Sequence, residues 1–378
     1  MKYGHLERIN LTLRMLAPVF IGSGERLNKK EYIFDAKKGI IYFLDLPRLV
    51  VFLKSRSLLS KYEEFLIQPR YKDFRVFLKE NKIVEADYSS FVSYSITAGE
   101  AARVPNFREV VTFIKDADGR PYIPGSSLKG AIRTALAAQL MKKGDWDQER
   151  RNIEVADTSG PPRRYLSGES SILEKKAFYR LGIQNPKNGE VLFSPINDFM
   201  QGIRISDSAA VDFENLTLAG KYDRKPDGTF NLLPIFRECL IPGTEVQLLM
   251  TLDRPMLAKV GLDLNSIEDA LHSFADDHYA NFEQFFTELP EDASIEAKQG
   301  VDIILGGGAG YVSKTLTYNL LPMRDQAVSV TAKILAKQFQ RHGHFKDASK
   351  YKVSPHILKT TMYAGEYYQM GKCELILK

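Results

Sequence analysis

The amino-acid sequence predicts an α+β fold with two ferredoxin-like lobes, each with the element order βαββαβ. Segments in which apolar and polar residues alternate, typical of half-buried strands, are interspersed with segments whose apolar residues recur at helical spacing. The order strand, helix, strand, strand, helix, strand can be fitted loosely to each half of the 378 residues. We therefore predict an N-terminal lobe over residues 1–240 and a C-terminal lobe over residues 241–378.

The N-terminal lobe begins with a predicted strand from Ile9 to Ile21, which ends at Gly22-Ser23-Gly24. Two shorter strands follow, over Tyr32–Phe34 and Gly39–Leu44, separated by a turn. Residues near 46–95 are rich in Leu, Phe, Lys and Glu at roughly helical spacing. This pattern predicts a helical insertion of two or three helices.

The next predicted helix opens at residues 121–127, where Ser126 or Ser127 is the expected N-cap. Apolar residues recur from Leu128 to Leu140 with the spacing of a stripe that faces a core. The residues that follow, about 144–188, are polar and contain two arginine pairs. We predict a long, mobile basic loop there.

The second half of the chain contains four predicted strands and one long helix. The segment Ile203–Asp207 reads as a strand that runs into a turn, and Gly243–Leu252 alternates as a further strand. An amphipathic helix is predicted from Ser266 to about Leu289. Two strands are expected near the end, over Thr360–Tyr363 and Cys373–Leu377.

Composition limits the class of protein. The chain has 52 basic and 47 acidic residues, and the net charge of +5 permits a nucleic-acid partner without demanding one. The two cysteines, Cys239 and Cys373, have no cysteine or histidine at metal-ligand spacing, so we expect neither a disulfide scaffold nor a metal site. No apolar run approaches 18 residues and no signal-peptide pattern opens the sequence, so a cytoplasmic protein is expected.

The strongest local signal is residues 122–133, which read YIPGSSLKGAIR. Gly125 permits a sharp turn and a close approach to a ligand. The first helical turn, at Ser126-Ser127, presents unpaired backbone N–H groups, and Lys129 and Arg133 lie on one side of the helix at i and i+4. The combination suits a phosphate. A capped core helix with two solvated basic residues is the alternative.

A second signal is the glycine-rich run at residues 306–310, GGGAG, followed by Tyr311 and Lys314. Ordering so many glycines costs conformational entropy, and the backbone amides of such a loop can bind phosphates. Tyr311 suits stacking on a base or ribose. A flexible connector is the alternative. Gly22-Ser23-Gly24 is a weaker signal of the same kind.

Neither glycine stretch fits a nucleotide-binding motif. A Walker A loop requires Gly-Lys-Ser/Thr, whereas Lys129 precedes Gly130 here. In the later run, Tyr311 stands where a dinucleotide-binding loop needs glycine. An NTPase or a dinucleotide-dependent enzyme therefore has little support.

Residues suited to catalysis are few. His342 and His344 lie beside Arg341 and Lys346, which favours a solvated basic turn over an acid/base pair. Asp207 follows a strand and is typical of a turn cap. Because the zinc-protease and serine-hydrolase motifs are also missing, we expect no enzymatic activity and no cofactor.

Four segments together resemble the RAMP superfamily of CRISPR effector proteins. They are LAPVFIGSGE at 16–25, YIPGSSLKGAIR at 122–133, IRISDS at 203–208 and LGGGAGYVSKT at 305–315. Within the superfamily the sequence is most similar to the family that forms the fifth subunit of type III-A complexes. The resemblance touches both ends and the middle of the chain, but not residues 55–95 or 145–190.

The resemblance implies RRM-like lobes and a non-catalytic place at the end of the effector complex. There the subunit would hold the 3′ part of the guide RNA, cap the filament of repeated backbone subunits and support guide maturation. The implied partners are guide (CRISPR) RNA, the backbone RAMP subunit, other subunits of the complex and maturation nucleases. The residues expected to line the RNA groove are Gly22, Ser23, Gly24, Gly125, Ser126, Ser127, Lys129, Arg133, Gly306, Gly307, Gly308, Gly310, Tyr311, Lys314 and, more weakly, Arg204.

One departure from the family pattern argues against target cutting. The repeated backbone subunit uses an aspartate in the loop after its first glycine motif, whereas residues 25–31 read ERLNKKE, with Asp35 the nearest aspartate. Three alternatives stay open. In the first, the protein is a RAMP endoribonuclease with His342 or His344 as its base. In the second, it is the subunit that grips the 5′ handle. In the third, it is a scaffold that recruits maturation nucleases.

Overall fold

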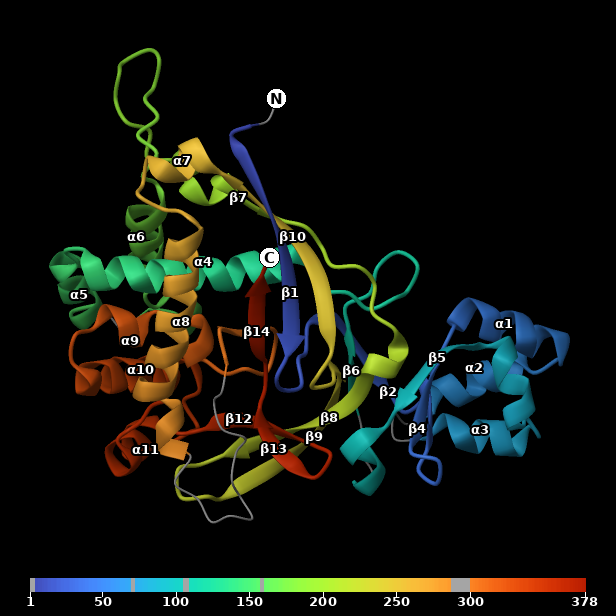
Figure 1. Cartoon of the computed structure of the whole chain (residues 1–378). Helices are drawn as coiled ribbons and strands as arrows, with labels where there is room; N and C mark the ends of the chain where they lie inside the picture. The colour runs from blue at the N-terminus through green and yellow to red at the C-terminus, as the bar shows by residue number, and fades with distance from the viewer. Residues whose placement is uncertain (1–3, 69–71, 105–108, 157–159, 287–299) are drawn as a thin grey trace.

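The computed structural model describes residues 4–68, 72–104, 109–156, 160–286 and 300–378. Within these ranges the strands form two sheets, most helices pack beside them, and a separate group of helices lies at one end of the molecule (Figure 1). The predicted α+β class is therefore confirmed.

The strands are β1 (Leu6–Met15), β2 (Gly22–Asn28), β3 (Tyr32–Asp35), β4 (Ile40–Leu44), β5 (Val92–Thr97), β6 (Glu109–Phe113), β7 (Ile203–Ile205), β8 (Leu216–Arg224), β9 (Phe230–Leu240), β10 (Glu245–Asp253), β11 (Ile303–Ile304), β12 (Leu358–Tyr363), β13 (Glu366–Gln369) and β14 (Lys372–Leu377). The helices are α1 (Leu46–Ser55), α2 (Leu59–Ile67), α3 (Phe74–Glu80), α4 (Gly125–Lys143), α5 (Asp147–Glu154), α6 (Ser167–Phe178), α7 (Arg254–Ala258), α8 (Leu264–Asn281), α9 (Thr317–Leu320), α10 (Arg324–Gln338) and α11 (His344–Tyr351).

The first sheet contains a ferredoxin-like unit. Its strand order is β11-β14-β1-β10-β7, and every neighbouring pair is antiparallel. In chain order the unit reads β1, α4, β7, β10, α8, β14, which is the βαββαβ arrangement. Helices α4 and α8 pack against each other beside the sheet (Figure 1). The unit joins both ends of the chain, because β14 pairs with β1 along Leu11–Met15.

The second sheet is longer and mixed. Its order is β2-β6-β9-β8-β5-β4-β3, and β12 adds to β8 with β13 beyond it. Strands β8 and β9 form a long antiparallel hairpin, whereas β5 runs parallel to β8 and β6 parallel to β9. Each sheet combines strands from both sides of residue 240.

The strand predicted over Ile9–Ile21 ends early, at Met15 in β1. Pro18 has no backbone N–H to donate to a ladder, and Val19 then makes a single bridge to Leu240. The apolar residues that follow are buried without belonging to a strand, so the alternation extended the prediction beyond the true end of β1.

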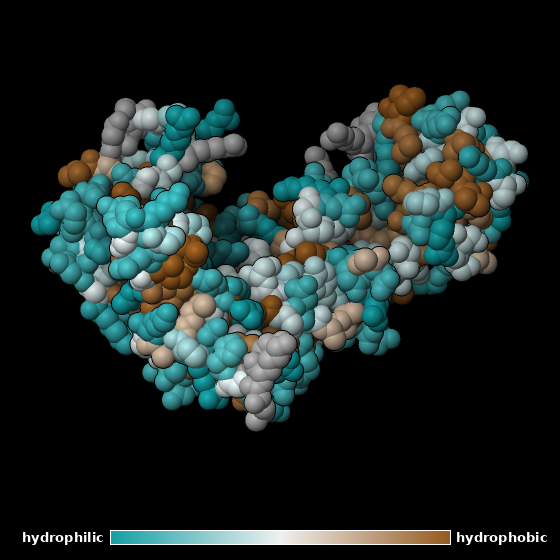
Figure 2. Space-filling view, turned by 90° about the horizontal axis from the view of Figure 1, so that it is seen from above, coloured by the Kyte–Doolittle hydropathy of each residue, from teal (hydrophilic) through white to brown (hydrophobic). Residues whose placement is uncertain are grey.

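The predicted helical insertion is confirmed as α1, α2 and α3. These helices have their own small core, in which Phe74 stacks on Phe77 with ring centroids 5.6 Å apart and Tyr62 packs edge-on against both. Apolar side chains also remain on the outside, including Val51, at 69% exposed, and Ile67, at 86%. Figure 2 shows hydrophobic surface gathered on this end of the molecule.

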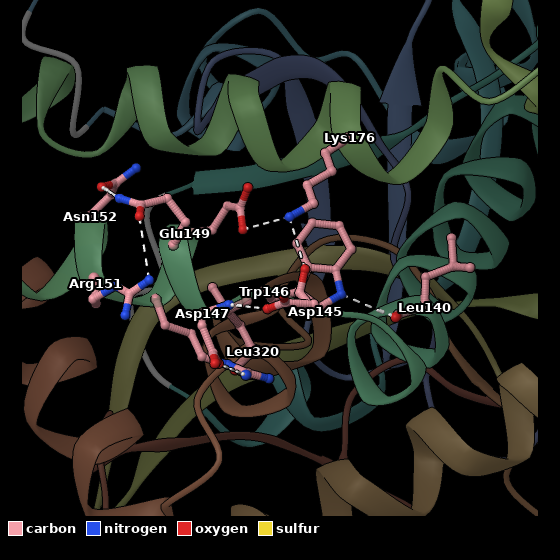
Figure 3. Close-up of polar contacts among 11 residues, drawn as sticks. Leu140, Asp145, Trp146, Asp147, Glu149, Arg151, Asn152, Lys176 and Leu320 are labelled. Atoms are coloured by element: carbon pink, nitrogen blue, oxygen red, sulfur yellow. Dashed lines mark hydrogen bonds and ion pairs between the residues drawn. The ribbon is translucent and has the colours of Figure 1, made fainter. Parts of the chain in front are cut away.

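The prediction of a long loop over residues 144–188 is wrong, because α5 and α6 occupy much of it. Lys176 in α6 donates to the Glu149 carboxylate and to the Asp145 carbonyl, both at 2.8 Å (Figure 3). The Trp146 indole donates to the Leu140 carbonyl at 3.2 Å and is almost fully buried. A few well-spaced apolar residues therefore anchor helices whose remaining residues are polar.

The later predictions hold in outline. The strands expected near 203, 243, 360 and 373 are β7, β10, β12 and β14. The helix predicted over Ser266–Leu289 is α8, which begins earlier because the Asp263 side chain accepts a hydrogen bond from Ser266 N at 2.9 Å. It ends at Asn281, and residues 287–289 lie outside the described ranges. None of the described helices has the length and apolar composition needed to cross a membrane.

Candidate nucleic-acid interface

Helix α4 begins one residue before the serines that were expected to cap it. Pro124 is its N-cap, and the N–H of Gly125 donates to the Asp207 carboxylate at 2.8 Å. A β-carbon on Gly125 would lie 2.3 Å from the Ile205 carbonyl oxygen. The prediction that Ser126 or Ser127 caps the helix is wrong, because a carboxylate from the turn after β7 does so. Gly125 is required by packing within the chain.

Beyond this first amide, α4 presents an open face. Ser126 and Gly130 are exposed, Ser127 and Lys129 are partly exposed, and a β-carbon on Gly130 would meet nothing within 4 Å. Lys129 makes no hydrogen bond or ion pair with any described residue. Burial, together with neighbouring Arg133 and Arg204, lowers the pKa of Lys129 although Asp198 opposes this effect. The lysine is therefore a cation without a direct partner.

The two arginines predicted to bind RNA differ in their ion pairs. Arg133 donates to Asp198 at 2.8 Å and to Glu174 at 2.9 Å, and its guanidinium lies 3.6 Å from the centroid of the Phe178 ring. Arg204 is exposed on β7 and forms no ion pair with a described residue. Arg133 is thus held by its own chain, whereas Arg204 remains available beside Lys129.

The two glycine-rich segments meet at Phe20. The N–H of Gly307 donates to the Phe20 carbonyl at 2.6 Å, and a β-carbon on Gly306 would lie 2.1 Å from that oxygen. The Gly22 position is likewise closed by the Phe20 ring, at 2.8 Å from an added β-carbon. The run at residues 306–310 is therefore a packed loop, which answers the alternative of a loose connector.

Other positions in these segments stay open. Ser23 lies 2.6 Å from Thr112 across the β2–β6 pair, measured between the hydroxyl oxygens, but is itself exposed. Gly24 has a φ of +92° with open space around it, and Gly310 has a φ of +97°. An L-residue rarely adopts these backbone angles. These are the points at which a ligand backbone can come close to the loops.

A group of cations under the glycine-rich loop escaped the sequence analysis. We call Lys221, Arg237 and Lys359 the basic cluster; they lie on β8, β9 and β12. An added β-carbon on Gly308 would lie 2.8 Å from the Arg237 guanidinium, and one on Gly310 would lie 3.8 Å from Lys359. Three strands distant in sequence supply the cluster, so only the sheet pairing could have revealed it.

The basic cluster has more cations than carboxylates. Among described residues its ion pairs go to Asp223 alone, at 2.8 Å from Lys359 and 3.9 Å from Lys221. Arg237 contacts Met370 sulfur at 3.7 Å and lies 5.3 Å from the Phe20 ring centroid. Burial, above all other causes, lowers the pKa of Arg237 and of Lys221. An anion at this place would relieve the uncompensated positive charge.

Tyr311 and Lys314 connect the two regions. Both line a cavity of about 470 Å³ that also contains Arg133 of α4. The Tyr311 hydroxyl lies 3.2 Å from the Thr317 hydroxyl, and burial raises the tyrosine pKa. Lys314 is exposed and has no ion pair with a described residue, while partial burial lowers its pKa. Helix α4, from Arg133 onward, and the residues that directly follow the glycine-rich run therefore line one cavity.

The histidines considered for catalysis form a separate group. The ring centroids of His342 and His344 are 5.8 Å apart, and those of His344 and His356 are 5.7 Å apart. His356 lies 3.1 Å from the Asp347 carboxylate. His344 is buried, neither of its ring nitrogens has a hydrogen-bond partner in the described part of the chain, and burial is the main cause that lowers its pKa. In the described ranges no three His, Cys, Asp or Glu side chains are grouped as metal ligands.

Both cysteines are fully buried. Cys239 has no exposed surface, and burial raises its thiol pKa to about 12. Burial likewise raises the pKa of Cys373 above the ordinary thiol range. Neither thiol has the exposure or the low pKa of a reactive nucleophile.

The sequence is similar to proteins of a known family. The family model of the RAMP superfamily matches residues 12–311. A CRISPR system Cms protein Csm5 from Mycobacterium tuberculosis (strain CDC 1551 / Oshkosh) is 30% identical over 394 residues, covering 99% of this chain and 98% of that protein. The Csm5 of Streptococcus thermophilus is 34% identical over 316 residues, covering 81% and 79%.

Solved structures show the same fold. A chain in the cryo-EM structure of a Csm–crRNA–target RNA ternary complex, from a type III-A CRISPR–Cas system, aligns with a TM-score of 0.63 and 20% identity, covering 98% of this chain and 100% of that one. The crystal structure of T. onnurineus Csm5 aligns with a TM-score of 0.57 and 19% identity, covering 96% and 99%. The chain belongs to the RAMP superfamily and, within it, to the family of the Csm5 proteins.

Proposed function

We propose that this protein is a non-catalytic RNA-binding subunit of a type III-A CRISPR effector complex. It holds the 3′ part of the guide RNA by the backbone, caps the filament of repeated subunits and supports guide maturation. The observation that carries the proposal is the meeting of two glycine-rich loops at Phe20 above the basic cluster. Within the described ranges one carboxylate, Asp223, forms ion pairs with this cluster, and it reaches Lys359 and Lys221 but not Arg237. Membership of the Csm5 family supports the place in the complex.

The chemistry of the site favours recognition of the RNA backbone. Its cations and open glycines suit phosphates and 2′-hydroxyls, which carry no sequence information. Lys129 and Arg204 extend the positive surface along α4 and β7. We therefore propose sequence-independent binding with strong salt dependence.

The residues near the first glycine motif support a non-catalytic role. Residues 25–31 contain no aspartate, and Glu25 accepts a hydrogen bond from the Thr112 hydroxyl at 3.1 Å. Asp35 accepts from the backbone N–H groups of Lys37 and Lys38 at 3.0 and 3.1 Å, as a turn residue does. Neither carboxylate stands free in the loop to act on RNA.

Crosslinking mass spectrometry tests the proposal on the protein purified with its natural partners and RNA. The expected result is crosslinks from the 3′ part of a guide-like RNA to peptides holding Gly22–Gly24 and Gly306–Lys314. Crosslinks confined to the 5′ handle would identify the protein as the subunit that grips the 5′ end of the guide RNA. If no RNA copurifies, the glycine loops only pack the chain and the scaffold that recruits nucleases becomes the better reading.

The endoribonuclease alternative keeps one observation in its favour, the grouping of His342, His344 and His356. The burial of His344 opposes it. A double variant, His342→Ala with His344→Ala, separates the two functions. If cells that carry this variant contain guide RNA of normal length, the endoribonuclease alternative is excluded. If they accumulate uncut guide precursor although the variant is folded, the non-catalytic role is excluded.

A further inference from the structure

The cavity shared by α4, α6 and the segment after the glycine-rich loop is separate from the glycine positions and the basic cluster to which we assign backbone binding. It holds about 470 Å³, a volume typical of pockets for small organic groups. Aromatic side chains from three segments line it: Tyr165 before α6, Phe178 at the end of α6, and Tyr311. Flat apolar walls of this kind suit a planar ring.

One polar group in this cavity lacks a partner among the residues that the structure describes. The Tyr165 hydroxyl is buried and makes no hydrogen bond with any of them. An unmade hydrogen bond at a buried hydroxyl costs stability, so a ligand that supplies a donor or acceptor is favoured there. Burial, and then nearby Glu169 and Tyr311, raise the pKa of Tyr165, which keeps the hydroxyl neutral and able both to donate and to accept.

One cation of the cavity lining has no carboxylate partner among the described residues. This cation is the exposed Lys314, whereas Arg133, which lies over the Phe178 ring, is neutralised by Asp198 and Glu174. A positive charge beside an apolar pocket is complementary to a nucleotide, whose flat base is joined through its ribose to a phosphate. An aliphatic side chain from a protein would leave both Lys314 and the Tyr165 hydroxyl unused.

We propose that this cavity receives a single unstacked nucleobase of the bound RNA, with Tyr165, Phe178 and Tyr311 as its walls and Lys314 on the adjoining phosphate. The inference rests on the proposed function, because the RNA must first lie along the glycine-rich loops. Tyr311 follows Gly310 directly, so a strand held at the loop passes the mouth of the cavity.

The test uses the full chain and an oligoribonucleotide that carries 4-thiouridine, whose base forms zero-length photocrosslinks. In the wild-type protein we expect crosslinks to the peptides of Tyr165 or Tyr311, in addition to the glycine loops. Ser170→Trp places a bulky ring into the cavity from an exposed position of α6, so it should abolish the crosslinks at Tyr165 and weaken binding roughly tenfold, the usual effect of losing one stacked base.

Ile172→Trp is the matched control, because Ile172 is exposed on the same helix and does not line the cavity. It should bind and crosslink like the wild type. Crosslinks at the glycine loops without any in the cavity overturn the nucleobase site and leave the proposed function standing. Absence of RNA binding altogether overturns both. If Ser170→Trp binds RNA normally but fails to assemble with its complex, a protein side chain occupies the cavity and the inference is wrong.

Discussion

At the residue scale, the structure separates cations that their own chain has neutralised from cations that it has not. Arg133 pairs with Asp198 and Glu174, whereas Lys129, one turn away, has no ion pair with a described residue. The sequence predicted equal roles for the two, because a helical repeat places them together but says nothing about carboxylates from other elements. Lys129 becomes the sharper test of phosphate contact.

Lys129→Ala should weaken RNA binding to a similar degree for unrelated sequences. It should also make the slope of log affinity against log salt concentration less steep by about 0.7, the value for one phosphate contact on a single strand. The slope is measured by titrating RNA at several salt concentrations. Lys61→Ala, which removes an exposed charge from α2, should leave the slope unchanged. An equal decrease in both variants would mean that only net charge matters.

At the element scale, the structure shows which glycines the fold needs. An Ala side chain at Gly125 would be forced against the carbonyl oxygens of Ile205 and Ser206, at 2.3 and 2.4 Å. Gly125→Ala should therefore lower the free energy of unfolding by about 1–3 kcal/mol, as overpacking does. Urea denaturation of the purified variant measures this. An unchanged midpoint would show that α4 can shift away from β7 without cost.

Gly130 lies in the same helix with open space around it, so packing against the described residues does not require a glycine there. Gly130→Ala should raise the free energy of unfolding by about 1 kcal/mol, the difference in helix propensity. If RNA passes close to this face, the added methyl should weaken binding roughly tenfold, as the loss of one charge-assisted hydrogen bond would.

Gly168→Ala is the control for Gly130→Ala, because Gly168 also lies in a helix with nothing within 4 Å. It should stabilise without any effect on RNA. Stabilisation by both variants with unchanged RNA affinity would remove the α4 face from the interface.

The errors of the sequence analysis at this scale have one physical source. Local pattern identified α4, α8 and the helical insertion, whose apolar residues recur regularly. It missed α5 and α6, where a few anchors such as Trp146 hold polar helices through tertiary contacts. It also expected local serines to cap α4, whereas the first helical amide donates to Asp207, which is far away in sequence. In each case the structure depends on contacts with residues that are distant along the chain, which a local pattern does not reveal.

At the scale of the whole molecule, a βαββαβ unit was predictable, but not its distribution over both halves of the chain or its strand pairing. The βαββαβ unit is assembled from β1 and β14 at opposite ends of the chain. The same long-range pairing creates the basic cluster, whose members belong to β8, β9 and β12. The glycine segments could be found by composition alone, but the cations beneath them needed the sheet.

A buried ion pair ties the C-terminal strand to this architecture. Lys372 at the start of β14 donates to Glu283, which follows α8, and both side chains are less than a tenth exposed. Burial alone would raise the pKa of Glu283, but His278, whose Nδ1 lies 3.6 Å from the carboxylate, and the Lys372 ammonium together outweigh it and lower the pKa below 4.5. The ionised pair therefore stabilises the folded state at neutral pH.

Glu283→Gln should lower the free energy of unfolding at pH 7 by about 3–5 kcal/mol, because Lys372 is left buried without its carboxylate. A carboxylate whose folded pKa is depressed stabilises fully above its unfolded pKa of about 4.5 and loses that contribution as pH falls through the lower folded value. The difference in free energy of unfolding between wild type and variant should thus narrow as urea denaturation is repeated at falling pH.

The control is Glu374→Gln, which removes a partly exposed carboxylate from β14, the strand that also contains Lys372. Glu374 pairs with Arg14, and its loss should lower the free energy of unfolding by no more than about 1 kcal/mol. A gap between wild type and Glu283→Gln that stays constant down to the lowest pH would show that the pair acts by shape and hydrogen bonding, independent of its charge.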